Sequence, residues 1–131
     1  MPIYTALVTV LAVALYFSTG LMVAKARGKY GVKPPATTGN VDFERVFRVQ
    51  MNTLEWMPIF LPLLWLFAVF VKDWAAAALG LVWLVGRVLY IQGYVRAAED
   101  RHRGFMVQAM ASGALLIGSA AGIIWRLVQG G

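Results

Sequence analysis

The sequence predicts an all-α integral membrane protein, a four-transmembrane-helix bundle that forms a single domain over residues 1–131. Of the 131 residues, 60% are hydrophobic and 14% are charged, and the mean hydropathy is +0.69, so polar side chains are too few to cover a globular core. Four apolar stretches can each cross about 30 Å of hydrocarbon, which takes roughly 20 helical residues. The alternation of apolar and polar residues that marks a transmembrane barrel is missing from the sequence. The expected spans are residues 3–25, 43–71, 74–98 and 104–127.

Each span is justified by its charges and its ends. Residues 3–24 carry no charge, and since no basic residue precedes them and no small-residue cleavage site follows, we expect a retained anchor rather than a signal peptide. Residues 56–71 are uncharged but short for a crossing, so the second helix must begin upstream, near Phe43. The third stretch, residues 74–95, is interrupted only by Arg87, and residues 104–125 carry no charge.

The basic residues gather on one side of the predicted bundle. Nine of the twelve flank the connections after the first and third spans: Lys25, Arg27, Lys29, Lys33, Arg45, Arg48, Arg96, Arg101 and Arg103. The positive-inside rule therefore predicts that both connections face the cytoplasm. The net charge of +6 reports this topology and not a nucleic-acid partner. In the first connection Pro34 and Pro35 oppose helix, and Asp42 is the expected N-cap of the second helix.

Polar side chains inside the second span need an explanation, because a charge in the membrane costs at least about 2.5 kcal/mol. On a helix that turns about 100° per residue, Arg48, Asn52 and Glu55 lie within about 60° of one another and form one polar stripe. The stripe predicts either a binding site or an ion pair between Arg48 and Glu55 that joins helices or subunits. Pro58 and Pro62 follow directly and predict a bend in the helix.

A second stripe lies on the third span. Arg87, Tyr90, Tyr94 and Arg101 share one face if the helix continues past the membrane edge. Two polar stripes that open towards the cytoplasm favour a binding site, whose halves need not come from the same subunit. The alternative is that the tyrosines are interfacial residues with local hydrogen bonds.

Two segments carry a resemblance to a known family. From Phe43 the chain reads FERVFRVQMNTLEWMPIFL, and from Arg87 it reads RVLYIQGYVRAAEDR. These motifs, and the PPATTG of the first connection, resemble the MAPEG family of membrane-associated proteins in eicosanoid and glutathione metabolism. Within that family they are most similar to the leukotriene C4 synthase and microsomal glutathione transferase 2 branch. The resemblance covers nearly the whole chain.

The resemblance implies a homotrimer that binds glutathione as co-substrate in a cytoplasm-facing cleft between subunits. It implies transfer of the glutathione thiolate to a lipophilic electrophile from the membrane lipid, with a possible peroxidase activity on lipid hydroperoxides. Arg101 matches the arginine that stabilises the thiolate. The implied glutathione contacts are Arg27, Arg48, Gln50, Asn52, Glu55, Tyr90 and Tyr94. No metal is expected, and the lack of cysteine excludes disulfides and thiolate metal sites.

The implied role of Arg101 agrees with the size of the effect that a guanidinium has on the pKa of a nearby thiol. A thiol with a pKa near 8.5 is only about 3% thiolate at pH 7. A guanidinium about 4 Å away, at an effective dielectric constant of about 20, contributes up to about 4 kcal/mol, or about three pKa units before desolvation is subtracted. No general base is required, so His102 is expected to be an exposed neighbour.

Three departures from the family pattern bear on substrate. Trp56 stands where leukotriene C4 synthase carries tyrosine, and Gly28 replaces an arginine of the first connection. His102 replaces the serine that follows the catalytic arginine in prostaglandin E synthase. These departures weaken the expectation of leukotriene or prostaglandin synthesis and leave the lipophilic substrate open.

Three other functions compete with a transferase. A non-catalytic lipid-binding member similar to the lipoxygenase-activating protein lacks arginines at the positions of Arg48 and Arg101, and both are present here. A small multidrug exporter requires an acidic residue in its first span, and residues 3–24 contain none. A purely structural trimer would bind no glutathione.

Overall fold

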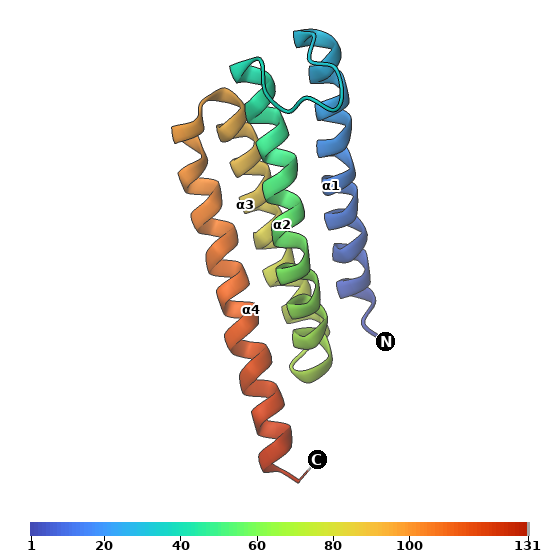
Figure 1. The fold of residues 1–131 in the computed structure, drawn as a ribbon. Coiled ribbons are helices and arrows are strands. Elements are labelled where there is room, and N and C mark those ends of the chain that lie inside the picture. Colours follow the sequence, from blue (N-terminus) through green and yellow to red (C-terminus); the bar gives the residue numbers. More distant parts are fainter. Residues whose placement is uncertain (131) are drawn as a thin grey trace.

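The computed structural model describes residues 1–130 and consists of four long helices; Gly131, the last residue of the expected domain, lies outside the described residues (Figure 1). A single 3₁₀ turn, η1, connects the third helix to the fourth. The elements are α1 (Ile3–Tyr30), α2 (Val41–Phe70), α3 (Asp73–Arg96), η1 (Ala98–Arg101) and α4 (His102–Val128). All four helices are long and apolar enough to cross a membrane, which confirms the predicted fold class.

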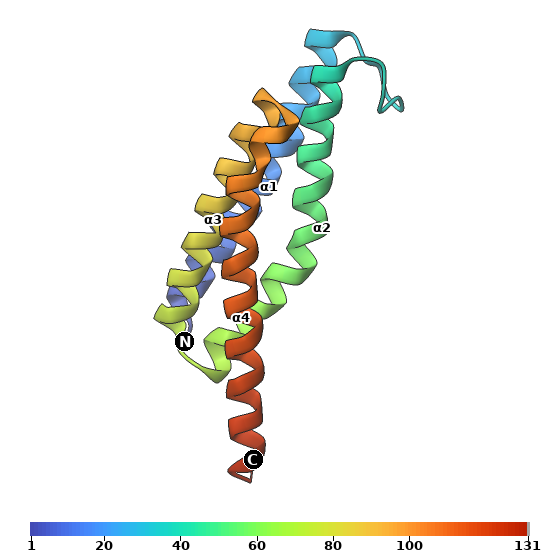
Figure 2. The same ribbon diagram turned by 90° about the vertical axis from the view of Figure 1, so that its left-hand side faces the viewer.

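The helices run antiparallel, and α1 and α4 lie on opposite sides of the central pair α2 and α3 (Figure 1). The connection from α1 to α2 and the turn η1 lie at one end of the bundle (Figure 2). Both termini and the short α2–α3 connection lie at the other end. The predicted pairing of connections is therefore correct, and their cytoplasmic orientation stays a prediction.

The N-terminus of α2 differs from the sequence-based expectation. Asn40, not Asp42, is the N-cap: its backbone is extended, with φ −154°, and its Oδ1 accepts a hydrogen bond of 3.0 Å from the backbone N–H of Phe43. Asp42 lies inside the first turn, where its carboxylate meets the positive end of the helix dipole and pairs with Arg45 at 3.1 Å. Both residues are suitable caps, and the position at which the first connection ends decides between them.

Helix α2 bends in its second half, as its two internal prolines predict. Pro58 and Pro62 each remove a backbone donor, and Figure 2 shows the axis of α2 turning below its midpoint. The bend brings the lower part of α2 towards α4, where Ser119 Oγ donates to the backbone carbonyl of Leu63 at 3.2 Å.

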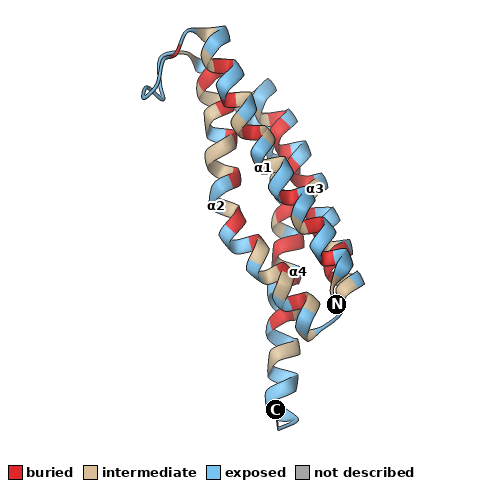
Figure 3. Cartoon of the chain, turned by 90° about the vertical axis from the view of Figure 1, so that its right-hand side faces the viewer, coloured by how far each residue is buried: buried red, intermediate tan, exposed pale blue. Residues whose placement is uncertain are grey.

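The largest core cluster joins all four helices. Its centre is the stack of Phe60 on Trp83, with ring centroids 3.9 Å apart and nearly parallel planes. Trp83 is therefore a packing residue, whereas Trp74 and Trp125 remain 62% and 65% exposed, as interfacial tryptophans do. The buried positions run along the inner sides of the helices, and the outer sides are exposed and largely apolar (Figure 3).

Helices α3 and α4 pack closely because glycines line their contact. A Cβ on Gly86 would lie 2.6 Å from the backbone N of Gln108, and one on Gly104 would lie 2.6 Å from the carbonyl O of Gly86. A Cβ on Gly93 would overlap the carbonyl of Asp100, within the turn η1 that leads into α4. In membranes small residues allow such close approach, because helix association there depends on van der Waals packing. This contact fixes η1 relative to the end of α3.

Candidate functional site

The C-terminal half of α3 carries Arg87, Tyr90 and Tyr94 of the second predicted stripe, but the helix does not continue to Arg101. Helix α3 ends at Arg96, and Arg101 is the last residue of the turn η1. The expectation that one helical face carries the whole stripe is therefore wrong. The turn nevertheless returns Arg101 to the same place, since its guanidinium carbon lies 5.4 Å from the centroid of the Tyr94 ring.

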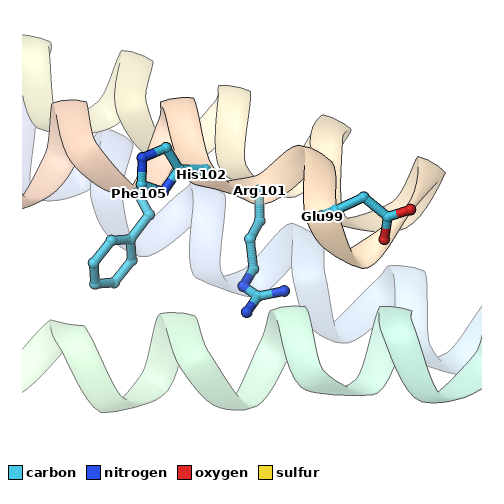
Figure 4. Close-up of a pocket in the computed structure, with 4 residues that line it drawn as sticks. All are labelled: Glu99, Arg101, His102 and Phe105. Atoms are coloured by element: carbon cyan, nitrogen blue, oxygen red, sulfur yellow. The ribbon is translucent and has the colours of Figure 1, made fainter.

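Arg101 projects into a cavity of about 640 Å³ at this end of the bundle. The cavity is lined by Glu99, Arg101, His102 and Phe105. Figure 4 shows the Arg101 side chain extending from η1 towards α2, while the carboxylate of Glu99 points away from it. His102 is exposed, as expected. A cavity of this size, with a guanidinium directed across it, can hold an anionic ligand of peptide size.

Two tyrosines separate Arg101 from a second guanidinium. The guanidinium carbon of Arg87 lies 4.2 Å from the centroid of the Tyr90 ring. The rings of Tyr90 and Tyr94 are 5.5 Å apart, and Arg101 follows at 5.4 Å from Tyr94. Each cation is attracted by the negative face of its ring, so the stacking orders all four side chains along the α2-facing side of α3. The structure thus brings the second predicted stripe together.

The α2 residues of the predicted site lie at different depths. Arg48 and Glu55 are exposed, whereas Gln50 and Asn52 are half-buried. In the described part of the chain Arg48 and Glu55 form no ion pair within 4 Å, so the alternative that they pair with each other is not found within one subunit. Gln50 faces α1, because its Nε2 lies 3.4 Å from where a Cβ on Gly20 would be.

Arg27 holds the first connection. Its Nη1 donates to the carbonyl oxygens of Val32 at 3.3 Å and Ala36 at 2.8 Å, and its guanidinium carbon lies 5.0 Å from the Phe43 ring. Arg27 therefore ties the end of α1 to the loop and to the start of α2. Among the described residues, the lining of the Arg101 cavity includes neither Arg27 nor any of the predicted α2 contacts.

Sequence reasoning gave no role to the contacts of Arg87. Its side chain is fully buried, and it donates to Asn52 Oδ1 at 2.8 Å and to Thr53 Oγ1 at 2.6 Å. Thr53 was missed as a partner because a threonine in an apolar helix gives no distinctive signal. The signal that was available is Arg87 itself, a charge within an apolar stretch, which needs acceptors on another helix.

The described residues contain no group of three or more His, Cys, Asp or Glu side chains that can hold a metal ion. The charged and aromatic groups of the site are instead guanidinium groups, aromatic rings and the exposed carboxylates of Glu55 and Glu99.

The fold and this site define a class: a four-span α-helical membrane protein with a cationic, aromatic-lined site at one end of the bundle. The chain belongs to the MAPEG family, whose family model matches residues 5–121. It is 53% identical to an uncharacterized protein of Synechocystis sp., over 97% of this chain and 93% of that protein. It is 42% identical to microsomal glutathione S-transferase 2 of Homo sapiens, over 92% of this chain and 82% of that protein. It is 41% identical to leukotriene C4 synthase of Bos taurus, over 89% of this chain and 78% of that protein.

Proposed function

We propose that this protein is a membrane-bound glutathione transferase that conjugates the glutathione thiolate to lipophilic electrophiles. The observation that carries the proposal is the guanidinium of Arg101, which stacks over Tyr94 and projects into a cavity of about 640 Å³. Two of its relatives are a microsomal glutathione S-transferase and a leukotriene C4 synthase, and this similarity supports the same chemistry.

Arg101 is the proposed catalytic residue. A guanidinium beside the bound thiol favours the thiolate, and it does so without accepting a proton. The sulfur then attacks an electrophilic carbon: the C–S bond forms, and the electron pair of the broken bond leaves with the displaced group or stays on an epoxide oxygen. The thiol proton passes to water. His102 has no part in these steps.

The charges on α2 match the charges of glutathione. Arg48 suits a carboxylate of the tripeptide, and Glu55 suits the ammonium of its γ-glutamyl residue. Gln50, Asn52, Tyr90 and Tyr94 supply polar contacts, with Arg27 nearest the loop. Since Arg48 and Glu55 are exposed in the single chain and lie outside the Arg101 cavity, we propose that the site is completed between subunits of a homotrimer, on its cytoplasmic side.

An apolar groove between α2 and α4 is the proposed path for the lipophilic substrate. Its volume is about 280 Å³, and its lining residues are Trp56, Ile59, Leu63, Ala109, Ser112, Gly113 and Leu116. Trp56 contacts Phe105 edge to face, with ring centroids 5.8 Å apart, and Phe105 also lines the Arg101 cavity. We propose that an electrophile from the membrane passes along this groove and the Trp56–Phe105 pair to the thiolate.

The same thiolate supports a peroxidase reaction on a lipid hydroperoxide. The sulfur attacks the terminal peroxide oxygen, the O–O bond breaks, and the lipid leaves as an alcohol. A second glutathione then displaces hydroxide from the oxidised sulfur, which gives glutathione disulfide and water. The second candidate function, non-catalytic lipid binding, is favoured by the apolar groove alone and requires no thiol chemistry.

The test is conjugation of glutathione to a generic electrophile by the purified protein in detergent. We expect Arg101→Ala to lower turnover by about 100-fold, because about 3 kcal/mol of thiolate stabilisation is lost, while glutathione still binds. The matched control is Arg103→Ala, which removes an equal charge from the exposed first turn of α4 and should leave turnover unchanged. Unchanged turnover in Arg101→Ala would refute the catalytic role, and a wild-type protein that binds lipid but neither binds nor conjugates glutathione would favour the second function.

A further inference from the structure

Arg87 is a buried cation without an acidic partner. It is 0% exposed near the middle of α3, and in the described residues no carboxylate lies within 4 Å of it. Its hydrogen bonds go to Asn52 Oδ1 and Thr53 Oγ1, both on α2. A charge at this depth is costly, and two neutral acceptors compensate it less well than one carboxylate would. A charged residue buried at this energetic cost indicates a functional role.

The bond to Asn52 fixes the orientation of an amide. A guanidinium only donates hydrogen bonds, so Asn52 must turn its oxygen to Arg87 and its NH₂ group away from it. Asn52 is half-buried and lies within about 60° of Arg48 and Glu55 around the helix axis, on the proposed glutathione face. The group that Asn52 offers at that face is therefore a donor.

Tyr90 holds the guanidinium from the other side. Its ring lies 4.2 Å from the guanidinium carbon of Arg87 and is itself buried, 3% exposed. The ring and the two acceptors together restrict the plane of the guanidinium, so that its two terminal nitrogens face α2. Arg87 and Tyr90 of α3 therefore set the orientation of the Asn52 amide.

We propose that Arg87 is a positioning residue that fixes the Asn52 amide as a hydrogen-bond donor, so that this part of the site takes a carboxylate or peptide carbonyl oxygen of the ligand and not its ammonium group. The inference rests on the proposed function, because it concerns the same glutathione site. It assigns the ammonium to another part of the site, where Glu55 provides the only acidic side chain of the stripe.

A purely structural role for Arg87 predicts different results. If Arg87 only joins α2 to α3, its loss lowers stability and affects binding independently of Asn52. If it acts through Asn52, its loss has no further effect on binding once the Asn52 amide is gone. A double-mutant cycle separates the two cases.

The first experiment measures glutathione binding calorimetrically, with the purified full-length protein in detergent. The variants are Arg87→Met, Asn52→Ala and the double variant; Met keeps the length of the side chain without its charge. We expect each single variant to weaken binding by about 10-fold and the double variant to bind within about twofold of Asn52→Ala. Thr53→Val removes the other acceptor of Arg87 but leaves the bond from Arg87 to Asn52, so it should weaken binding less than Arg87→Met does.

A second variant keeps the test decisive if Arg87→Met does not fold. Asn52→Asp gives Arg87 a charged partner, so its melting temperature should equal or exceed that of the wild type. It replaces the outward donor by an oxygen, so glutathione affinity should fall by about 10-fold or more, and kcat/KM for glutathione should fall with it.

Wild-type glutathione affinity in Asn52→Asp would overturn the inference. A double variant whose loss of affinity equals the product of the losses in Arg87→Met and Asn52→Ala would also overturn it. In both outcomes the wild type still binds glutathione, so the proposed function survives. A wild-type protein that binds no glutathione overturns the proposed function and this inference together.

Discussion

Helices α3 and α4 meet backbone to backbone, whereas α1 lies against the bundle along one narrow stripe. Between α3 and α4 the closest approach is at Gly86 and Gly104, with no side chain separating Gly104 from the backbone of α3. On α1 the buried residues form a single stripe at helical spacing: Thr5, Val8, Ala12, Thr19, Val23 and Ala26. Hydrogen bonds near both ends of α1 supplement this stripe. The two regions show two ways to join helices when the surrounding lipid is as apolar as the side chains.

The proposed catalytic residue lies on the side of the bundle where two helices are in backbone contact. The close α3–α4 contact positions η1, and η1 carries Arg101, so the guanidinium that faces the cavity is fixed by backbone packing. Helix α1 approaches the predicted site residues with its second half, at Gly20 beside Gln50 and at Arg27, which holds the first connection. We therefore expect changes at the α3–α4 contact to disturb both stability and catalysis, and changes at the start of α1 to disturb stability alone.

The largest effect is expected from Gly104→Ala. The added methyl would overlap the backbone N of Tyr90 and crowd the carbonyl of Gly86, and a backbone cannot move aside as a side chain can. We expect a loss of about 3 kcal/mol and a fall in conjugation, measured by thermal unfolding and turnover in detergent. The control is Gly113→Ala on the same helix, where a Cβ meets nothing within 4 Å. Equal stability of the two variants would contradict the close-packing argument.

An intermediate effect is expected from Asp73→Ala. The Asp73 carboxylate accepts hydrogen bonds from the backbone N–H groups of Thr5 at 2.9 Å and Tyr4 at 3.2 Å, so it caps the N-terminus of α1 from a different helix. We expect a loss of about 1 kcal/mol and faster hydrogen exchange of these two amides, with unchanged conjugation.

The matched variant Asp73→Asn keeps one acceptor oxygen and should show a smaller increase in exchange. Unaltered protection of the Tyr4 and Thr5 amides in Asp73→Ala would show that the cap contributes nothing to holding α1.

The smallest effect is expected from Trp65→Phe. The indole Nε1 of Trp65 donates to Thr9 Oγ1 at 2.9 Å, and this bond joins α2 to the first half of α1. Hydrogen bonds between transmembrane helices contribute about 0.6 kcal/mol on average. A double-mutant cycle of Trp65→Phe and Thr9→Val, with the stability of each variant measured by thermal unfolding, should give a coupling energy of this size. A coupling of zero would leave α1 held by its apolar stripe and its ends alone.

Local features of the sequence predicted the fold well. Uncharged stretches predicted the four spans because the cost of a charge in lipid depends only on local composition, and Pro58 and Pro62 predicted the bend in α2 for an equally local reason. The choice of Asn40 as N-cap was missed because Asn40 and Asp42 are both suitable caps in sequence. The different exposure of Trp83 and Trp125 was not predicted either, since the type of residue is the same.

The sequence predicted which residues belong to the candidate site better than it predicted how they are arranged in space. Helical spacing grouped Arg87, Tyr90 and Tyr94 correctly, but it placed Arg101 on a helix that ends before that residue. The return of Arg101 to Tyr94 depends on the turn η1, and that turn depends on Gly93 and on the approach of α4. The bonds from Arg87 to α2 could not be predicted, because they depend on how two helices are rotated against each other.

The sequence by itself determined that this chain forms four membrane-spanning helices, which side of the bundle carries the basic residues, and which polar side chains must lie inside the spans. These properties follow from hydropathy and charge, which each segment expresses independently of the others. Only the tertiary structure decided which groups meet: Arg87 with Asn52, Arg101 with Tyr94, and Asp73 with the start of α1. The physical reason is that a hydrogen bond or a cation–π contact acts over a few ångströms, so it exists only once packing has set the rotation and height of both helices.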